Sequence, residues 1–187
     1  IISTGAINKE LDSLPIDGVR IISTREALEL KSIPPRVTIV GGGAAGVEFA
    51  YLYASYDSKV TIVEMKPHLV PSEDEEISVI LEKSLGDQGI NSLTNAKVES
   101  LDWNESTGTI TVAQPDGKSQ VECDCVLVAI GLEGNVFGLG IDNLGIELQR
   151  GFISIDDKMR TNIPSVYAVG DVTGHTLLAH TAFAQGT

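Results

Sequence analysis

The chain has 187 residues, and its 13 basic and 26 acidic side chains give a net charge of −13. Apolar residues make up 42% and charged residues 21%, which is typical of a globular protein with room for about one domain and a fraction. The acidic excess argues against a nucleic-acid partner, because phosphates require a basic face. No apolar run approaches the ~18 residues that cross a bilayer, so no membrane partner is expected. Two cysteines predict no disulfide framework and favour a cytoplasmic location.

Both ends of the sequence resemble interrupted elements. The chain opens with IIST, which indicates a strand without its beginning, and the first residue is Ile rather than Met. It closes with LLAHTAFAQGT, which indicates a helix that stops soon after it starts. We therefore expect a fragment of a longer chain, with a trimmed but complete protein as the alternative.

The first predicted elements form a βαβ unit. Before it, Ser23 or Thr24 can cap a short helix, and Pro34-Pro35 ends that segment. The β-branched run 37–40 predicts a buried strand, and VEFAYLYASY, apolar on most faces, predicts a buried helix. Residues 59–64 (KVTIVE) predict the second strand, at a spacing that suits a right-handed crossover.

A second helix is predicted from Ser72. Ser72 and Glu75 have the spacing of a capping box, and Ile77, Ile80, Leu81 and Leu85 follow at helical spacing. The acidic run 73–76 has two interpretations, a metal site or a first helical turn that complements the helix dipole. Plain helix-terminal charge is the simpler of the two.

The remaining elements complete an α/β fold. Residues 96–123 alternate in polarity between two turn signals, which predicts a three-stranded β-meander. Residues 126–130 predict another buried strand, and residues 152–155 a short one. The fold expected is Rossmann-like, a parallel sheet with the meander as a crossover connection.

One motif points to chemistry. Gly41-x-Gly43-x-x-Gly46 follows a predicted strand and opens a predicted helix, which is the context that makes this pattern informative. The free N–H groups of such a helix start favour a phosphate. Glu64 ends the next strand and can accept hydrogen bonds from a ribose hydroxyl, so NAD is favoured over NADP, although Lys66 lies close enough to weaken the preference. The alternative is a glycine loop that serves only the turn.

Other candidate residues give weaker indications of function than the glycine motif. Glu48 either complements the start of the helix or faces the nicotinamide end of the cofactor. Cys123 and Cys125 are expected to share one face of a strand as ordinary packing residues, and the tyrosines of residues 51–56 are expected to pack. The three histidines are dispersed, so no metal site is expected.

Several segments in the right order resemble one family. VTIVGGGAAGVEFA, TIVEMKPHLVPSEDEEI, CVLVAIG and TNIPSVYAVGDVTG…LLAHTAFAQG are similar to the pyridine-nucleotide flavoprotein disulfide reductases, an FAD/NAD-linked reductase fold. The resemblance is greatest to the branch of that family that oxidises dihydrolipoyl groups. It implies that residues 1–34 end a first FAD segment and linker, 35–132 form the NAD domain, and 133–187 return to the FAD domain.

The resemblance also implies two sets of cofactor-binding residues. It assigns to NAD the residues Gly41, Gly42, Gly43, Ala44, Ala45, Gly46, Val47, Glu48, Glu64, Val98 and Gly131. It assigns to FAD the residues Thr4, Gly5, Ala6, Asp171, Leu177, Leu178, Ala179 and His180, the last through its backbone rather than as a base. The sequence departs from the family pattern at Ala6, at the segment 132–135 and at Gln185, where an acidic residue is common.

The activity implied is oxidation of dihydrolipoyl groups through FAD, with hydride passed to NAD⁺. The partner implied is the lipoyl-bearing acyltransferase of a 2-oxo acid dehydrogenase complex, and the parent protein is expected to be a homodimer. The family's redox cysteine pair and acid–base residues have no match here, so no catalytic residue is expected and the fragment alone should be inactive. The alternatives are another flavin reductase, such as an NADH oxidase, mercuric reductase or ferredoxin reductase, a stand-alone NAD(H)-binding module, or a structural module.

Overall fold

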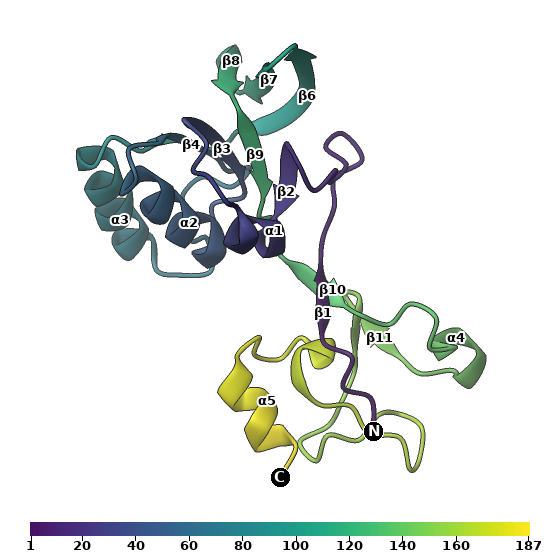
Figure 1. Ribbon diagram of the computed structural model, residues 1–187. Helices are drawn as coiled ribbons and strands as arrows, with labels where there is room; N and C mark the ends of the chain where they lie inside the picture. The colour runs from purple at the N-terminus through teal and green to yellow at the C-terminus, as the bar shows by residue number, and fades with distance from the viewer. The chain divides into compact units, whose positions relative to one another are not determined.

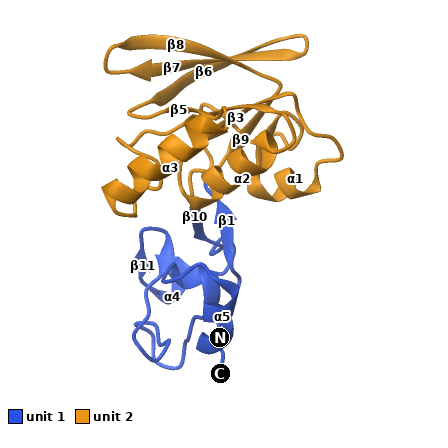
Figure 2. Ribbon diagram, turned by 90° about the vertical axis from the view of Figure 1, so that its left-hand side faces the viewer, with its two compact units in different colours: residues 1–9, 132–187 blue, residues 10–131 orange.

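A computed structural model describes residues 1–187 (Figure 1). It divides into two compact units, residues 10–131 and residues 1–9 with 132–187 (Figure 2). The larger unit contains β2 (Ile21–Ser23), α1 (Thr24–Glu29), β3 (Arg36–Val40), α2 (Ala44–Ala54), β4 (Lys59–Val63), α3 (Glu75–Asp87), β5 (Asn91–Leu93), β6 (Lys97–Asn104), β7 (Thr107–Gln114), β8 (Gly117–Cys123) and β9 (Cys125–Val128).

The larger unit is built on a parallel sheet, as predicted. Five strands lie in the order β2-β9-β3-β4-β5, and every neighbouring pair is parallel. Strands β6, β7 and β8 form a separate antiparallel sheet, which confirms the three-stranded meander. In Figure 2 the helices lie on one side of the parallel sheet and the meander on the other.

Alternation along the strands divides the interior into two cores. On β3, Val37 and Ile39 pack toward the helices, whereas Val40 packs toward the meander. On β9, Leu127 faces the helices and Val126 the meander. A strand buried on both faces needs apolar residues at consecutive positions, which is the reason the central strands have nearly continuous apolar sequences.

The two cysteines do not share a face, contrary to the sequence prediction. Cys123 ends β8 and belongs to the core under the meander, whereas Cys125 begins β9 and belongs to the core under the helices. The period-two rule fails because Asp124 separates two strands of different sheets. Both thiols are free and buried, so their role as packing residues is confirmed.

The short helix α1 starts as predicted, and α3 does not. Ser23 caps α1, and Glu26 completes the capping box. The cap of α3 is Asp74, whose carboxylate accepts the amide hydrogen of Glu76, so the predicted capping box from Ser72 is wrong. Asp74 caps the helix instead of Ser72 because its carboxylate is adjacent to the first free amides of the helix. Of the acidic run, Glu75 and Glu76 lie in the first turn of α3, where negative charge complements the helix dipole.

Helix α2 is buried on one side only. Phe49, Ala50 and Tyr53 are buried, whereas Tyr51 and Leu52 are 55% and 40% exposed. The predictions of an entirely buried helix and of a packed tyrosine cluster are therefore wrong for this outer face. A helix that is apolar on all sides has no distinct apolar stripe, so the sequence does not indicate which side is buried.

The smaller unit has little regular structure. Its elements are β1 (Ala6–Asn8), β10 (Leu132–Gly134), α4 (Ile141–Leu144), β11 (Leu148–Gln149), β12 (Phe152–Ile153), the 3₁₀ helix η1 (Gly170–Thr173) and α5 (Ala179–Gln185). Strand β1 pairs with β10, and β11 with β12, both antiparallel. A small core of Ile141, Ile146, Ile153, Ala168 and Val172 holds the unit together.

The unit that contains the glycine loop begins earlier than the predicted domain boundary at residue 35. Residues 10–34 belong to it because Ile21–Ser23 pairs in parallel with Val126–Val128 at the edge of the sheet. Across the whole structure, every helix is too short or too polar to traverse a bilayer.

Candidate functional site

The glycine loop connects β3 to α2 at the carboxyl end of the parallel sheet. Gly41 has φ +109°, and a Cβ atom there would collide with the backbone of Ala129 on the neighbouring chain segment. A Cβ atom at Gly46 would collide with the carbonyl oxygen of Gly41. These glycines allow the turn and the close approach of helix to strand that the motif predicts.

Gly42 is restricted by a different contact. A Cβ atom at this position would lie 2.5 Å from Cδ2 of Leu69 and 3.0 Å from Cβ of Glu64. Its carbonyl oxygen accepts the amide hydrogen of Val70 at 2.7 Å. The segment after β4 thus packs directly on the loop, which the spacing of the three motif glycines does not reveal.

Four amides at the start of α2 have no acceptor within the chain. Gly43 is the N-cap and makes no side-chain capping bond, and the first helical hydrogen bond of the backbone runs from Val47 to Gly43. The N–H groups of residues 43–46 therefore remain free, with Ala44 and Ala45 exposed. A Cβ atom at Gly43 would meet nothing within 4 Å. Free amides, the positive end of a helix dipole and open space together suit a phosphate.

Glu64 lies beside this loop and is 8% exposed. Its Oε2 accepts the amide hydrogen of Gly42 at 2.6 Å, and its Oε1 accepts that of Lys66 at 2.7 Å. An ionised carboxylate has about four acceptor positions, so two remain for further donors. The predicted ribose acceptor is thus also a brace that fixes the shape of the loop.

Three other residues of the predicted NAD set have surroundings of different kinds. Glu48 is exposed and lies beyond the first turn of α2, so its interpretation as a complement to the helix start loses support. Val98 is 6% exposed and packs with Val112 under the meander. Gly131 has φ +104° with open space where a side chain would stand.

The predicted FAD residues belong to the smaller unit. The hydroxyl group of Thr4 donates to the carbonyl oxygen of Asn135 at 2.6 Å, and Nδ2 of Asn135 donates to the carbonyl oxygen of Thr4 at 3.2 Å. The amide of Asn135 also donates to Gly5 at 2.9 Å, and Ala6 begins β1. Sequence reasoning gave Asn135 no role, although it ties this whole turn in place.

A second part of the FAD set surrounds Asp171. This residue lies in η1, directly after Gly170, which has φ +77°, and its carboxylate makes no hydrogen bond within the chain. Helix α5 starts at Ala179 and has no buried residue. Leu177 and Leu178, just before it, are 41% and 49% exposed, and His180 is exposed too.

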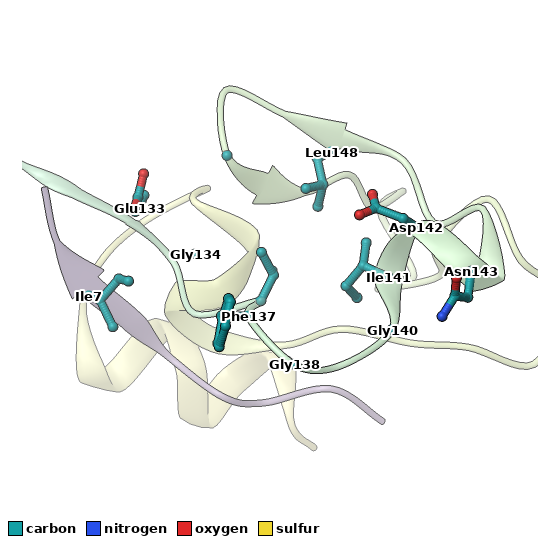
Figure 3. Close-up of a pocket in the computed structure, with 12 residues that line it drawn as sticks. Ile7, Glu133, Gly134, Phe137, Gly138, Gly140, Ile141, Asp142, Asn143 and Leu148 are labelled. Atoms are coloured by element: carbon teal, nitrogen blue, oxygen red, sulfur yellow. The ribbon is translucent and has the colours of Figure 1, made fainter.

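One hollow of the smaller unit lies apart from these residues. It has a volume of about 480 Å³, and Figure 3 shows Ile7 and Phe137 on one side of it and Ile141 and Leu148 on another. Glu133 and Asp142 add carboxylates, and no basic side chain lines it. None of the residues predicted to bind a cofactor belongs to its lining.

The two thiols can be excluded as redox groups. Burial raises the pKa of Cys123 to about 11 and that of Cys125 to about 12. A thiol held protonated is a poor nucleophile, and the two sulfur atoms lie in different cores. These cysteines therefore do not form a dithiol site.

Residues 1–186 match the family described as "Pyridine nucleotide-disulphide oxidoreductase". The chain belongs to this family. The resemblance seen in the sequence is thereby confirmed, and FAD and NAD, the cofactors predicted from it, are those of the family.

Relatives and solved structures agree with this assignment. Dihydrolipoyl dehydrogenase of Chlorobaculum tepidum is 42% identical over 99% of this chain, and that of Zymomonas mobilis 40% identical over 100%. The chain spans about 40% of the length of each of these relatives. LpdA from Mycobacterium tuberculosis superposes with a TM-score of 0.87 at 34% identity, with 98% of this chain and 40% of that one covered. The HOCl-induced flavoprotein disulfide reductase RclA from Escherichia coli superposes with a TM-score of 0.84 at 30% identity, and the match covers 97% of this chain and 41% of the RclA chain.

Proposed function

We propose that this chain supplies the NAD(H) site and part of the FAD wall of a larger dihydrolipoyl dehydrogenase. The observation that carries the proposal is the braced glycine loop, in which Glu64 holds Gly42 and leaves the amides of residues 43–46 free. The donor set fits a diphosphate, since these N–H groups have no acceptor within the chain and a Cβ atom at Gly43 would meet no other atom within 4 Å. In that position the four amides would bind the NAD pyrophosphate.

Selectivity for NAD follows from the sign of the charge at Glu64. Each of its oxygens accepts one backbone amide and keeps further acceptor capacity, which suits two ribose hydroxyl donors. A 2′-phosphate brings negative charge and acceptors instead, so it would be repelled by the carboxylate. Lys66 is exposed and can only partly offset this repulsion through solvent.

The smaller unit is proposed to form part of the flavin site. Thr4 and Gly5 are fixed by Asn135, and the carboxylate of Asp171 has no competing partner in the chain. Asp171 would accept hydrogen bonds from hydroxyl groups of FAD, and residues 177–180 would contact the flavin. When bound, FAD supplies the two-electron chemistry, while the protein positions it.

The proposed reaction of the larger protein is oxidation of dihydrolipoyl groups to the lipoyl disulfide, with hydride passed to NAD⁺. The partner proposed is the acyltransferase that carries the lipoyl group in a 2-oxo acid dehydrogenase complex, and the larger protein is proposed to be a cytoplasmic homodimer. The identity of about 40% between this chain and dihydrolipoyl dehydrogenases supports this substrate. The 187 residues alone are proposed to be inactive, because their two cysteines are buried in separate cores.

A second candidate is a flavoprotein disulfide reductase with another substrate. The RclA structure, similar over 97% of this chain, favours this class. The two candidates differ in their electron donors, so the full-length gene product should be assayed with NAD⁺ and dihydrolipoamide. NADH formation supports the first candidate, and its absence in an enzyme that still oxidises NADH supports the second.

The NAD site can be tested with this chain alone. Addition of the chain should raise the fluorescence of NADH and shift it to shorter wavelength, because the nicotinamide leaves water. A matched variant, Gly43→Val, places a side chain in the open space at the loop and should abolish the change. An equal response from both proteins, or from neither, would contradict the proposed site.

A further inference from the structure

Gln185 connects the last helix to the turn that presents Asp171. Gln185 is the final residue of α5, and its Oε1 accepts a hydrogen bond of 2.7 Å from the amide of Gly170. Gly170 begins η1, fifteen residues earlier in the chain. This hydrogen bond therefore joins η1 and α5, two separate elements of the smaller unit.

Both backbone polar groups of Gly170 are fixed by side chains. Its amide donates to Gln185, and its carbonyl oxygen accepts the hydroxyl hydrogen of Thr173 at 2.8 Å. Thr173 is 6% exposed, so its hydroxyl group is shielded from competing water. Gly170 has φ +77°, a conformation that few other residues adopt. A residue held on both sides in this way sets the direction of the peptide that follows, which leads into Asp171.

The carboxylate of Asp171 has no hydrogen bond of its own within the chain. Its direction therefore depends on the backbone that carries it, and Gln185 is one of the two side chains that hold this backbone. On the basis of the proposed FAD site, we infer that Gln185 is a positioning residue that orients Asp171 toward the hydroxyl groups of the flavin nucleotide.

The side-chain chemistry at position 185 makes the inference specific. The amide of Gly170 needs an acceptor, and Oε1 of Gln185 provides one. A glutamate would also accept this hydrogen. Methionine has nearly the volume of glutamine and lacks a strong acceptor, so it separates the hydrogen bond from packing.

The test measures the dissociation constant of FAD, from flavin fluorescence, in the full-length gene product. Loss of one hydrogen bond near the ligand corresponds to a change of about five- to tenfold in a dissociation constant. We expect Gln185→Met to raise the dissociation constant of FAD by this factor. The dissociation constant of Gln185→Glu should stay within about twofold of that of the unaltered protein. Gln88→Ala is the matched control, because Gln88 also bonds a backbone group at the end of a helix, but in the other unit.

A double variant distinguishes positioning from plain structural support. If Gln185 acts through Asp171, Gln185→Met should have no further effect on FAD binding in the Asp171→Asn background. An equal loss in both backgrounds would overturn the inference, as would a Gln185→Glu variant that binds FAD as weakly as Gln185→Met. If Asp171→Asn weakens FAD binding and Gln185→Met does not, only the inference fails. If Asp171→Asn has no effect, the proposed FAD role of Asp171 fails with it.

Discussion

Oε2 of Glu64 accepts a hydrogen bond of 2.6 Å from the amide of Gly42, which lies twenty-two residues earlier. This contact links the end of β4 to the glycine loop after β3, two neighbouring strands of the parallel sheet. It fixes the loop before a ligand arrives, so the free amides of residues 43–46 are already oriented. Preorganisation of this kind lowers the entropic cost of binding.

Replacement of Glu64 by arginine should change both affinity and cofactor preference. Glu64→Arg removes the acceptors for Gly42 and Lys66 and reverses the charge at the position proposed to bind the ribose. Hydrogen bonds to charged groups contribute about 1.5–3 kcal/mol, so NADH affinity should fall at least about tenfold and the ratio of NADPH to NADH affinity should rise. Titration calorimetry with both nucleotides measures this, with Glu73→Gln, an exposed acid, as control. An unchanged affinity and ratio would remove Glu64 from the site.

Two glycine-to-alanine variants should change stability in opposite directions. Gly42→Ala forces a methyl group against Leu69 and Glu64, and overpacking of this kind costs about 1–3 kcal/mol. Gly86→Ala lies in α3 with open space around it, and alanine should stabilise this helix by about 0.5–1 kcal/mol. Urea unfolding of both variants tests the prediction. If Gly42→Ala is as stable as the unaltered chain, the close packing on the loop is disproved.

The cysteines should be unreactive in the folded protein. Burial raises the pKa of Cys123 to about 11 and of Cys125 to about 12, so neither is a thiolate at neutral pH. A thiol reagent such as dithiobis(nitrobenzoate) should therefore label neither side chain at pH 8 in minutes, and both in urea. Rapid labelling of one cysteine in the native state would show that a core opens readily.

Acid should weaken the connection between the meander and the parallel sheet. Two nitrogens of the Arg36 side chain donate to the carboxylate of Asp124, Nε at 3.0 Å and an Nη at 2.6 Å. This hydrogen bonding lowers the pKa of Asp124 from its ordinary value of 3.8. A lowered folded-state pKa gives stability that is complete above the unfolded value and is lost as the pH falls through the folded value.

Asp124→Asn should therefore be less stable at pH 7 and should lose less stability than the unaltered chain when the pH falls below 3.8. Thermal unfolding at a series of pH values measures both effects. Asp116→Asn, in the exposed turn between β7 and β8, is the control and should follow the unaltered chain. Parallel stability curves for Asp124→Asn and the unaltered chain would show that the pair with Arg36 contributes nothing.

The sequence predicted those features that depend on short-range rules. The strand–glycine–helix order around Gly41 and the start of a short helix at Ser23 or Thr24 follow from local backbone chemistry, and both are present, with Ser23 as the cap. The meander follows from alternation and turn residues. Each of these signals lies within one continuous segment of the chain.

Contacts between distant segments could not be predicted in the same way. The bond from Gly42 to Glu64, the bond from Gly170 to Gln185 and the role of Asn135 each depend on tertiary packing. The shared face assigned to Cys123 and Cys125 failed because a strand change falls between them. The helix or strand to which a residue belongs can be predicted from the local sequence. Its contact partner in a distant segment is known only from the structure.

The central claim is that the amides of residues 43–46 bind a diphosphate. The most direct measurement is an NMR titration of the ¹⁵N-labelled chain with NADH, in which each backbone amide gives its own signal. We predict that the signals of residues 43–46 and of Glu64 shift progressively and saturate, while those of Gly138 and Gly145 in the smaller unit do not move. Saturating NADH that leaves the signals of residues 43–46 in place would contradict the claim.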